Sequence, residues 1–508
     1  MPRRIAIFDT TLRDGQKAPG LCMSLDERLE VARQIARLGA DVIEAGHPAA
    51  SPDDFASVKE IARVVRGPII SSFARAGDGE IDEAWEAVRG AERPRLHLVL
   101  PTSPPGMKRA LGIGPGDLLD LTVRTVRRAR NLCAEVELSA EDATRSDPDF
   151  LCRVFQAAIE AGAAIVNVPD SFGYAVPDEF AGLVRKLLAG VPDIDRAALS
   201  VHCYDDLGLA LANTLAAIGA GAQQVECTVN GLGERAGNAA IEELVMALAI
   251  RSEILGAYCD ADATQIYGTS KLVQAVTGFR VQPNKAVVGD KALVREGDEG
   301  YRAISPESIG MPTAGLALGK HSGRGAFEER LASIGYRPRP DSISELYGSF
   351  KELASRKRTV TDRDLEALAL GAFALGAFAR GSGTYRLDRF VINSGSTISA
   401  TSAVRLAMRD GVLCERVSVG DGPIDASFKA IDKVVGKHPI LEAFSLDAVT
   451  EGKDAQGEAR VRIQCSGRRY NGRGLSTDAV EASIKAYVAA INVMTQDMED
   501  RHEPDRGS

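Results

Sequence analysis

The first 255 residues alternate between short apolar runs and longer amphipathic segments, and this alternation limits the possible folds more than any other feature. The apolar runs are RIAIFDTTL, ADVIEAGHP, GPIISSFA, RLHLVLP, EVELSAEDA, AAIVNVPDS, ALSVHCYDD and QQVECTVNG. The segments between them, such as DERLEVARQIARL, repeat their apolar residues with helical spacing. Eight strand–helix units of this length predict an α/β fold, a (β/α)8 TIM barrel, over residues 1–255.

Two further regions follow the predicted barrel, as expected for a chain of 508 residues, which is too long for one core. Residues 256–380 contain short helical patterns and loops, and we interpret them as a helical linker region. Residues 385–495 repeat the order strand, strand, glycine turn, helix. This repeat predicts a C-terminal α+β domain with an internal ββα repeat. Such a domain either binds a small carboxylate at its helix N-termini or serves for dimerisation alone.

Charge, hydropathy and cysteine usage exclude several classes of function. The net charge of −9 argues against a nucleic-acid partner, because nucleic-acid binding usually needs a concentrated basic surface. No apolar run approaches the roughly 20 residues that span a bilayer, and the start MPRRIAIFDTTL leaves no room for a signal peptide. The eight cysteines form no CxxC pair, so we expect free thiols in a cytoplasmic protein with no membrane partner.

Polar residues end nearly every predicted strand, and in barrels of this type the chemistry takes place where strands end and loops begin. Each of these residues alone can simply cap a helix, but their recurrence favours a shared pocket. They are Arg13, Asp14, Glu44, His47, Glu141, Ser171, His202 and Tyr204, together with the loop after Asn230.

The pair Arg13–Asp14, in the segment DTTLRDGQKAPG, indicates which chemistry the pocket supports. The carboxylate can bind a divalent ion, and the neighbouring guanidinium can stabilise an enolate oxygen. Glu44 can orient Arg13, and Glu141 is a further carboxylate for proton transfer. His47 either enters the pocket or packs in its loop against Pro48.

The loop NGLGERAGNA follows the last predicted strand and precedes a helix. A glycine-rich loop can approach a ligand closely, so we expect Gly231, Gly233 and Glu234 to contact the substrate. Asn238 offers an oxygen ligand to a metal ion.

Several long motifs make the chain similar to the α-isopropylmalate synthase family, which is related to the homocitrate and citramalate synthases. The motifs are DTTLRDG, ELSAEDATR, NVPDSFGYA, LGKHSGRGAF and NGLGERAGNAAIEELVMAL. The resemblance covers essentially the whole chain, including a C-terminal domain like the leucine-sensing regulatory domain of the family. It implies a homodimeric enzyme that condenses acetyl-CoA with a 2-oxo acid, such as 3-methyl-2-oxobutanoate, with the help of Mg2+, Mn2+ or Zn2+.

The resemblance also assigns roles to individual residues. Asp14 and His202 would ligate the metal ion, and Asn238 would lie near the same ion. Arg13 would polarise the carbonyl group of the 2-oxo acid, and Ser171 occupies a position that contacts its carboxylate.

The chain departs from the family pattern inside this site. Tyr204 stands where the family has a second metal-binding histidine, and a phenolate can ligate the metal only if it ionises. Gly106 and Arg295 replace two further histidines of the family, and a short deletion after Arg295 removes a catalytic histidine. In the other direction, His47 stands where family members usually have an apolar residue. Two alternatives therefore stay open: an altered or inactive paralogue that binds a metabolite or partner, and a lyase or hydrolase that uses the same enolate pocket.

Overall fold

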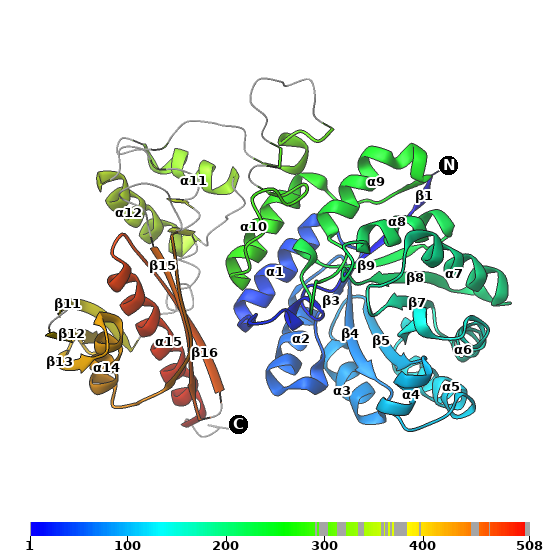
Figure 1. Cartoon of the computed structure of the whole chain (residues 1–508), viewed down its shortest axis with the longest axis horizontal. Coiled ribbons are helices and arrows are strands. Elements are labelled where there is room, and N and C mark those ends of the chain that lie inside the picture. The colour runs from blue at the N-terminus through cyan, green and yellow to red at the C-terminus, as the bar shows by residue number, and fades with distance from the viewer. Residues whose placement is uncertain are drawn as a thin grey trace. The chain divides into compact units, whose positions relative to one another are not determined.

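A computed structural model divides the chain into two compact units, Met1–Thr313 and Ala314–Ser508 (Figure 1). The residues that the structure describes are 2–289, 292–293, 303–311, 318, 322–333, 340–356, 360, 364–365, 368–369, 384–395, 398–448, 457–466 and 468–502.

The first unit contains a closed barrel of eight parallel strands, and each strand includes part of a predicted apolar run. The strands are β2 (Ala6–Asp9), β3 (Val42–Glu44), β4 (Ile69–Arg75), β5 (Pro94–Pro101), β6 (Val136–Glu141), β7 (Ile165–Asp170), β8 (Ala198–Cys203) and β9 (Gln224–Cys227). Each strand pairs with the next in the chain, and β9 closes the barrel by pairing in parallel with β2. The predicted (β/α)8 barrel is therefore confirmed.

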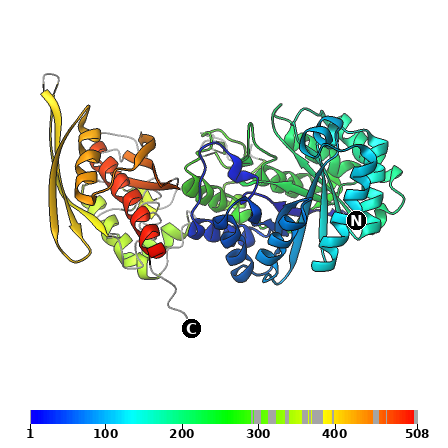
Figure 2. The ribbon, with the colours of Figure 1, turned by 90° about the horizontal axis from the view of Figure 1, so that it is seen from below.

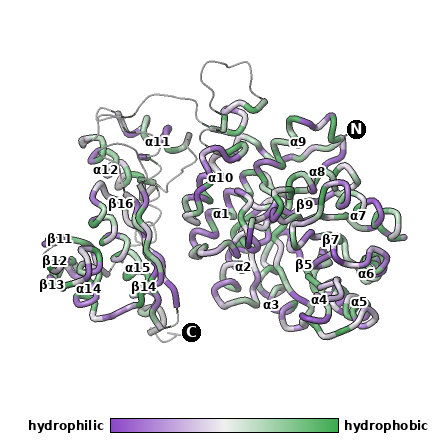
Figure 3. Tube along the Cα trace, viewed as in Figure 1, coloured by the Kyte–Doolittle hydropathy of each residue, from purple (hydrophilic) through white to green (hydrophobic). Residues whose placement is uncertain are grey.

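Helices surround this barrel (Figure 1). They are α1 (Leu25–Leu38), α2 (Pro52–Val64), α3 (Asp78–Val88), α4 (Pro104–Ala110), α5 (Pro115–Leu132), α6 (Pro148–Ala161), α7 (Pro177–Gly190), α8 (Ala210–Ala220) and α9 (Ile241–Leu255). In Figure 3 they carry both hydrophilic and hydrophobic colours, as expected when one face of each helix packs on the strands. Within the described ranges, we find no helix whose length and apolar character would let it cross a bilayer.

Helix α1 shows how the local sequence sets these elements. Ser24 and Glu27 form a capping box at its start, and Gly39 ends it with a φ of 86°, a left-handed conformation that favours glycine. Ile35 and Leu38 lie on its buried face. The helix limits therefore follow from capping chemistry that is readable in the sequence.

The segment after α9 belongs to the barrel unit. Two short strands pair in parallel outside the barrel, β1 (Arg3–Arg4) and β10 (Ala257–Tyr258), and helix α10 (Ile266–Thr277) follows. Gln34 Nε2 on α1 donates a hydrogen bond of 2.9 Å to Thr269 Oγ1 on α10. Ser270 Oγ on the same helix donates to Asn230 Oδ1 at 2.5 Å. Helix α10 thus holds the loop that follows β9.

The second unit begins with two helices and continues as two sheets. The helices α11 (Arg324–Ser333) and α12 (Pro340–Arg356) meet through aromatic rings, and the Phe327 and Phe350 centroids are 4.7 Å apart. The first sheet has the order β11 (Tyr385–Gly395), β12 (Ile398–Met408) and β13 (Leu413–Gly420), and α14 (Pro423–Val435) packs on it (Figure 2). The second has β14 (Ile440–Ala448), β15 (Gly457–Cys465) and β16 (Arg468–Ser476), packed by α15 (Ala479–His502).

The internal repeat of the C-terminal region is present, but each half has three strands before its helix instead of two. The third strands, β13 and β16, escape the sequence pattern for different reasons. Strand β13 is largely exposed, so its residues show no buried alternation. Strand β16 contains Gly472 and Gly474, which resemble a turn in the sequence. Both are glycine because α15 packs closely: a Cβ at Gly472 would lie 2.1 Å from the carbonyl oxygen of Ala486.

Candidate active site

Glu44, at the end of β3, is fully buried and holds Arg13 in place. Its Oε2 accepts hydrogen bonds of 2.6 Å from Arg13 Nε and from Thr10 Oγ1, and its Oε1 lies 2.7 Å from Nδ1 of His97 on β5. Burial alone would raise the pKa of Glu44, but Arg13 and His97 hold it well below its usual range. Glu44 is therefore an ionised carboxylate with the geometry that the predicted orienting role requires.

The Arg13 guanidinium is fixed on several sides. It hydrogen-bonds to Asp14, its Nη2 lies 3.9 Å from Glu226 Oε2, and its centre lies 4.9 Å from the centroid of the Phe73 ring. Burial opposes its charge, but Glu44, Asp14 and the other carboxylates around it raise its pKa further above the usual range. A rigid, buried cation at the strand ends can stabilise the oxygen of an enolate or alkoxide.

Asp14 receives hydrogen bonds at both carboxylate oxygens. Its Oδ1 lies 2.7 Å from Lys17 Nζ and also accepts from Arg13. Its Oδ2 accepts from Tyr204 Oη at 2.7 Å and from Asn238 Nδ2 at 3.0 Å. Burial would raise the pKa of Asp14, but Arg13 and Lys17 hold it far below its usual range. Asp14 is thus an ionised carboxylate whose charge is already neutralised by side chains.

The hydrogen bonds of His202 fix its protons. Asn238 Nδ2 donates to the carbonyl oxygen of Leu232 at 2.8 Å, so the amide oxygen of Asn238 faces His202 Nε2 at 2.7 Å. Nε2 must therefore carry a hydrogen. Nδ1 lies 2.7 Å from Glu226 Oε2. Burial would lower the pKa of His202, but the neighbouring Glu226 and Asp14 carboxylates raise it above its usual value.

These donors do not match a divalent-metal site. The residues predicted as ligands, Asp14, His202, Tyr204 and Asn238, do come together, but they form a hydrogen-bonded network. Burial and the charge of Asp14 raise the pKa of Tyr204 well above its usual value, so the side chain stays a neutral phenol. His202 Nε2 has no lone pair for a metal while it bears the hydrogen that it donates to Asn238, and the Lys17 ammonium repels a second cation at Asp14.

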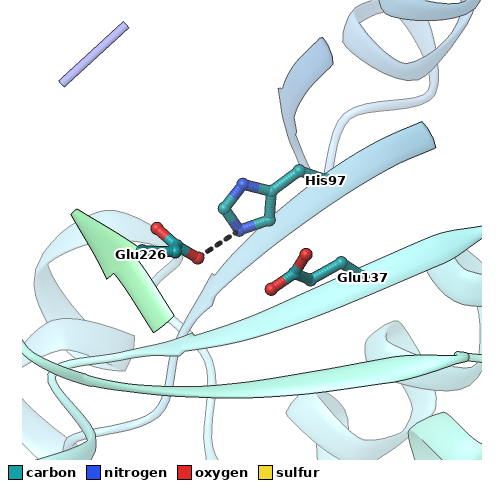
Figure 4. A group of neighbouring side chains, drawn as sticks. All are labelled: His97, Glu137 and Glu226. Atoms are coloured by element: carbon teal, nitrogen blue, oxygen red, sulfur yellow. Dashed lines mark ion pairs between the residues drawn. The ribbon is translucent and has the colours of Figure 1, made fainter. Parts of the chain in front are cut away.

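A second group of possible metal ligands lies deeper in the barrel. One ligand atom each from His97, Glu137 and Glu226 lies within 4.8 Å of the others, and Figure 4 shows the side chains converging from β5, β6 and β9. Each already has protein partners: Arg95 Nη1 is 2.8 Å from Glu137, and Ser139 Oγ is 2.7 Å from His97 Nε2.

The charge of His97 is set by the same carboxylates. Burial would lower the pKa of His97, but Glu44 and Glu226 raise it to about 9. His97 is therefore an imidazolium surrounded by carboxylates, and two of these carboxylates, Glu137 and Glu44, also pair with Arg95 and Arg13.

The glycines of the loop after β9 serve the packing of Asn238. A Cβ at Gly233 would lie 2.4 Å from Asn238 Nδ2, and one at Gly231, whose φ is 69°, would lie 3.0 Å from the Asn238 carbonyl oxygen. Glu234, predicted to contact substrate, forms an ion pair of 3.1 Å with Arg235. The close approach that the glycines allow in this structure is to Asn238.

Arg235 connects this loop to Ser171. Its guanidinium lies 4.7 Å from the centroid of the Tyr204 ring, and its Nη2 donates to the Ser171 carbonyl oxygen at 2.8 Å. The Ser171 hydroxyl accepts from the backbone N–H of Asp142 at 2.9 Å. Ser171 therefore stands beside the Asp14 network, with a hydroxyl proton that it can donate to a ligand.

Glu141 and His47 stand apart from the network. Glu141 is exposed at the end of β6. Among the described residues, no ion pair or hydrogen bond joins its carboxylate to Asp14, Arg13 or Glu44. His47 Nε2 lies 3.0 Å from Glu80, and its ring packs edge-on against Phe73, with centroids 4.7 Å apart. Arg295 and the shortened segment around it lie outside the described residues.

Three residues of the site were not selected from the sequence: Lys17, His97 and Glu226. His97 and Glu226 occur inside the apolar runs RLHLVLP and QQVECTVNG, where a charged residue is unusual in a buried strand. That interruption is the signal that could have found them. Lys17 follows Asp14 by three residues, and its significance depends on the turn Gly15–Lys17 that returns it to Asp14.

Comparisons with known proteins agree along the whole chain. The profile of the HMGL-like family matches residues 4–273, the homocitrate synthase post-HMGL domain-like profile matches 276–358, and the LeuA allosteric (dimerisation) domain matches 359–495. The 2-isopropylmalate synthase of Heliobacterium modesticaldum is 48% identical over 507 residues, which cover 98% of each chain. That of Pelotomaculum thermopropionicum is 47% identical over 508 residues, covering 98% of this chain and 99% of its own. A solved structure of hydroxymethylglutaryl-CoA lyase from Pseudomonas aeruginosa aligns with a TM-score of 0.48 at 21% identity, covering 58% of this chain and 98% of that one.

Proposed function

Since the chain belongs to the 2-isopropylmalate synthase family and is an enzyme of that family, we propose that it condenses acetyl-CoA with 3-methyl-2-oxobutanoate or a closely related 2-oxo acid. The observation that carries this proposal is the buried Arg13, held by Glu44 and Asp14 at the strand ends. This arrangement supplies the fixed positive charge that a Claisen-type condensation needs where its oxyanion forms.

The reaction makes one carbon–carbon bond and cleaves one thioester. A base removes a proton from the acetyl methyl group, and the enolate carbon attacks the carbonyl carbon of the 2-oxo acid. The carbonyl oxygen becomes an alkoxide, which takes up a proton, and water then hydrolyses the thioester to release the CoA thiol. Arg13 stabilises the oxygen on which negative charge develops, and the Ser171 hydroxyl donates to the carboxylate of the acid. The exposed carboxylate of Glu141 is the proposed proton carrier.

Members of this family use acetyl-CoA and a divalent metal ion, but the donor set around Asp14 in this chain does not suit such an ion. It holds a phenol, a histidine whose Nε2 bears a hydrogen, and an ammonium group.

We also propose that the protein acts as a homodimer in the cytoplasm. The match of residues 359–495 to a dimerisation domain supports the dimer. The eight cysteines are all free in the structure, which is typical of a reducing compartment. The proposed boundaries remain 1–255 for the catalytic barrel, 256–380 for the linker and 385–495 for a leucine-sensing-like domain.

The test is release of CoA thiol from acetyl-CoA, with 3-methyl-2-oxobutanoate, 2-oxobutanoate, pyruvate and 2-oxoglutarate offered separately. Assays run with Mg2+, with Mn2+, with Zn2+ and with a chelator. We expect release that depends on one branched or short 2-oxo acid. Arg13→Met should abolish it, whereas Arg63→Met, which removes a surface arginine paired with Glu60, should not change it. Release that does not depend on any 2-oxo acid would show a hydrolase, and no release from folded protein would refute the proposed condensation.

A further inference from the structure

Lys17 provides a built-in cation at the site where the family binds its metal ion. We propose that in this chain the Lys17 ammonium replaces the divalent metal, neutralises Asp14 and binds the carboxylate of the 2-oxo acid. The assignment of the carboxylate as ligand rests on the proposed function, whereas the replacement of the metal does not.

The position of Lys17 suits this role. The turn Gly15–Lys17 directly follows Asp14 and returns Nζ to within 2.7 Å of Asp14 Oδ1. The Asp14 side chain is 0% exposed, but that of Lys17 is 44% exposed, so the pair reaches from the buried network to its open side. An ammonium group has three N–H donors, and one satisfies Asp14. The others can face an anionic ligand that arrives from solvent.

Arg13 does not make Lys17 redundant. The Arg13 guanidinium is shared, because Nε bonds to Glu44 and Nη2 approaches Glu226 while Nη1 bonds to Asp14. Among the described residues, Asp14 is the carboxylate to which Lys17 is paired.

Tyr204 removes the remaining place for a metal ion. Its hydroxyl donates to Asp14 Oδ2, so the oxygen that a metal would need on that side is already engaged. The Tyr204 ring stacks on His202 with an interplanar angle of 7° and a centroid distance of 5.0 Å, which fixes the hydroxyl over the carboxylate. Lys17 and Tyr204 thus act from opposite oxygens of Asp14, and each takes a position that a metal would occupy.

The simplest alternative is that Lys17 and Asp14 form an ordinary surface ion pair, because such pairs form easily and contribute little to stability. Two features separate this pair from that class. Its carboxylate is fully buried and belongs to a network of side chains, and its lysine is the solvent-exposed partner of that carboxylate. The pair Lys186–Asp149, 3.0 Å apart with both side chains exposed, is an ordinary surface example and gives a matched control.

The first experiment measures Mn2+ binding by the full chain, with calorimetry and with the Mn2+ signal in electron paramagnetic resonance. It compares the wild type, Lys17→Met, Tyr204→His and the double variant. We expect weak or no binding by the wild type, and binding about tenfold tighter or more in the double variant. One Mn2+ bound by the wild type as tightly as by the double variant would overturn the proposal. This readout does not depend on catalysis.

The second experiment measures CoA release in a chelator. We expect the wild type to keep its activity there and to gain none from added Mg2+, Mn2+ or Zn2+. Lys17→Met should raise the KM for the 2-oxo acid by about 10- to 100-fold, Lys17→Arg should restore part of it, and Lys186→Met should change nothing. Activity that strictly requires a divalent ion would refute the role of Lys17 but leave the condensation standing. If no variant releases CoA, the condensation fails and the Mn2+ titration alone decides on Lys17.

Discussion

Replacement of His97 by glutamine tests whether the barrel interior holds a buried imidazolium. Below the unfolded pKa of 6.5 this histidine is protonated in both the folded and the unfolded chain. In the folded chain Glu44 and Glu226 raise the pKa to about 9. Since the folded pKa is raised, the stabilisation is fully present below pH 6.5 and is lost as the pH rises through about 9.

The size of the effect follows from the two pKa values. One pKa unit corresponds to about 1.4 kcal/mol, so a rise from 6.5 to about 9 corresponds to about 3 kcal/mol. Asp9 and Glu242, whose burial raises the pKa of each to about 7, lose stabilisation in the same direction as the pH rises. The informative quantity is therefore the difference between wild type and His97→Gln, in which the contributions of those carboxyls cancel.

The assay is urea unfolding between about pH 6 and about pH 9. The chain has one tryptophan, Trp85 on α3, so its fluorescence follows the barrel and not the C-terminal unit. We expect the free energy of unfolding of the wild type to fall by about 3 kcal/mol more than that of His97→Gln over this range. His438→Gln, which changes an exposed histidine in the other unit, is the control. Parallel pH profiles for wild type and His97→Gln would show that folding does not raise the pKa of His97, and the charge assignment would be wrong.

Three further substitutions test the site. Arg13→Lys should lower kcat by about 10²- to 10³-fold, because an ammonium group cannot form the planar, forked contacts that the Arg13 guanidinium makes with Glu44 and Asp14. A kcat within a few-fold of the wild-type value in steady-state kinetics would contradict this. Gly233→Ala should displace Asn238 and lower the free energy of unfolding by about 1–3 kcal/mol in the same urea titration. The control is Gly182→Ala in α7, where an added Cβ meets nothing within 4 Å, and it should be neutral or slightly stabilising. Glu141→Gln should leave unfolding unchanged, since the side chain is exposed, but should lower kcat by about 10²-fold or more; an unchanged kcat would remove it from the mechanism.

The barrel could be predicted from the sequence because each strand combines an apolar run with a polar end. The polar strand ends also identified Arg13 and Glu44 as candidate site residues. The two pair with each other because β2 and β3 are neighbours in the barrel. The two missed strands, β13 and β16, lack that signature. In β16 the glycines exist for the close approach of α15, and a contact between distant segments cannot be read from a local pattern.

The protonation states of the site could not be predicted for a similar reason. The sequence shows His202 and Tyr204 at metal-binding positions, but it does not show that Glu226 lies on the other side of His202. Nor does it show that the Tyr204 hydroxyl points at Asp14. Whether a residue is a ligand or a hydrogen-bond donor depends on such neighbours, which come from other strands.

The cations and carboxylates of the central network already pair with one another. Arg13 pairs with Asp14 and Glu44, and Lys17 pairs with Asp14. His97 pairs with Glu44, and His202 Nδ1 lies 2.7 Å from Glu226. A divalent ion added to this network would have to displace one of these cationic partners, because unbalanced charge in a buried site is costly. Loss of Lys17 removes one of these cations, which is why Lys17→Met is expected to admit Mn2+ and why Tyr204→His, by adding a ligand, should strengthen its binding.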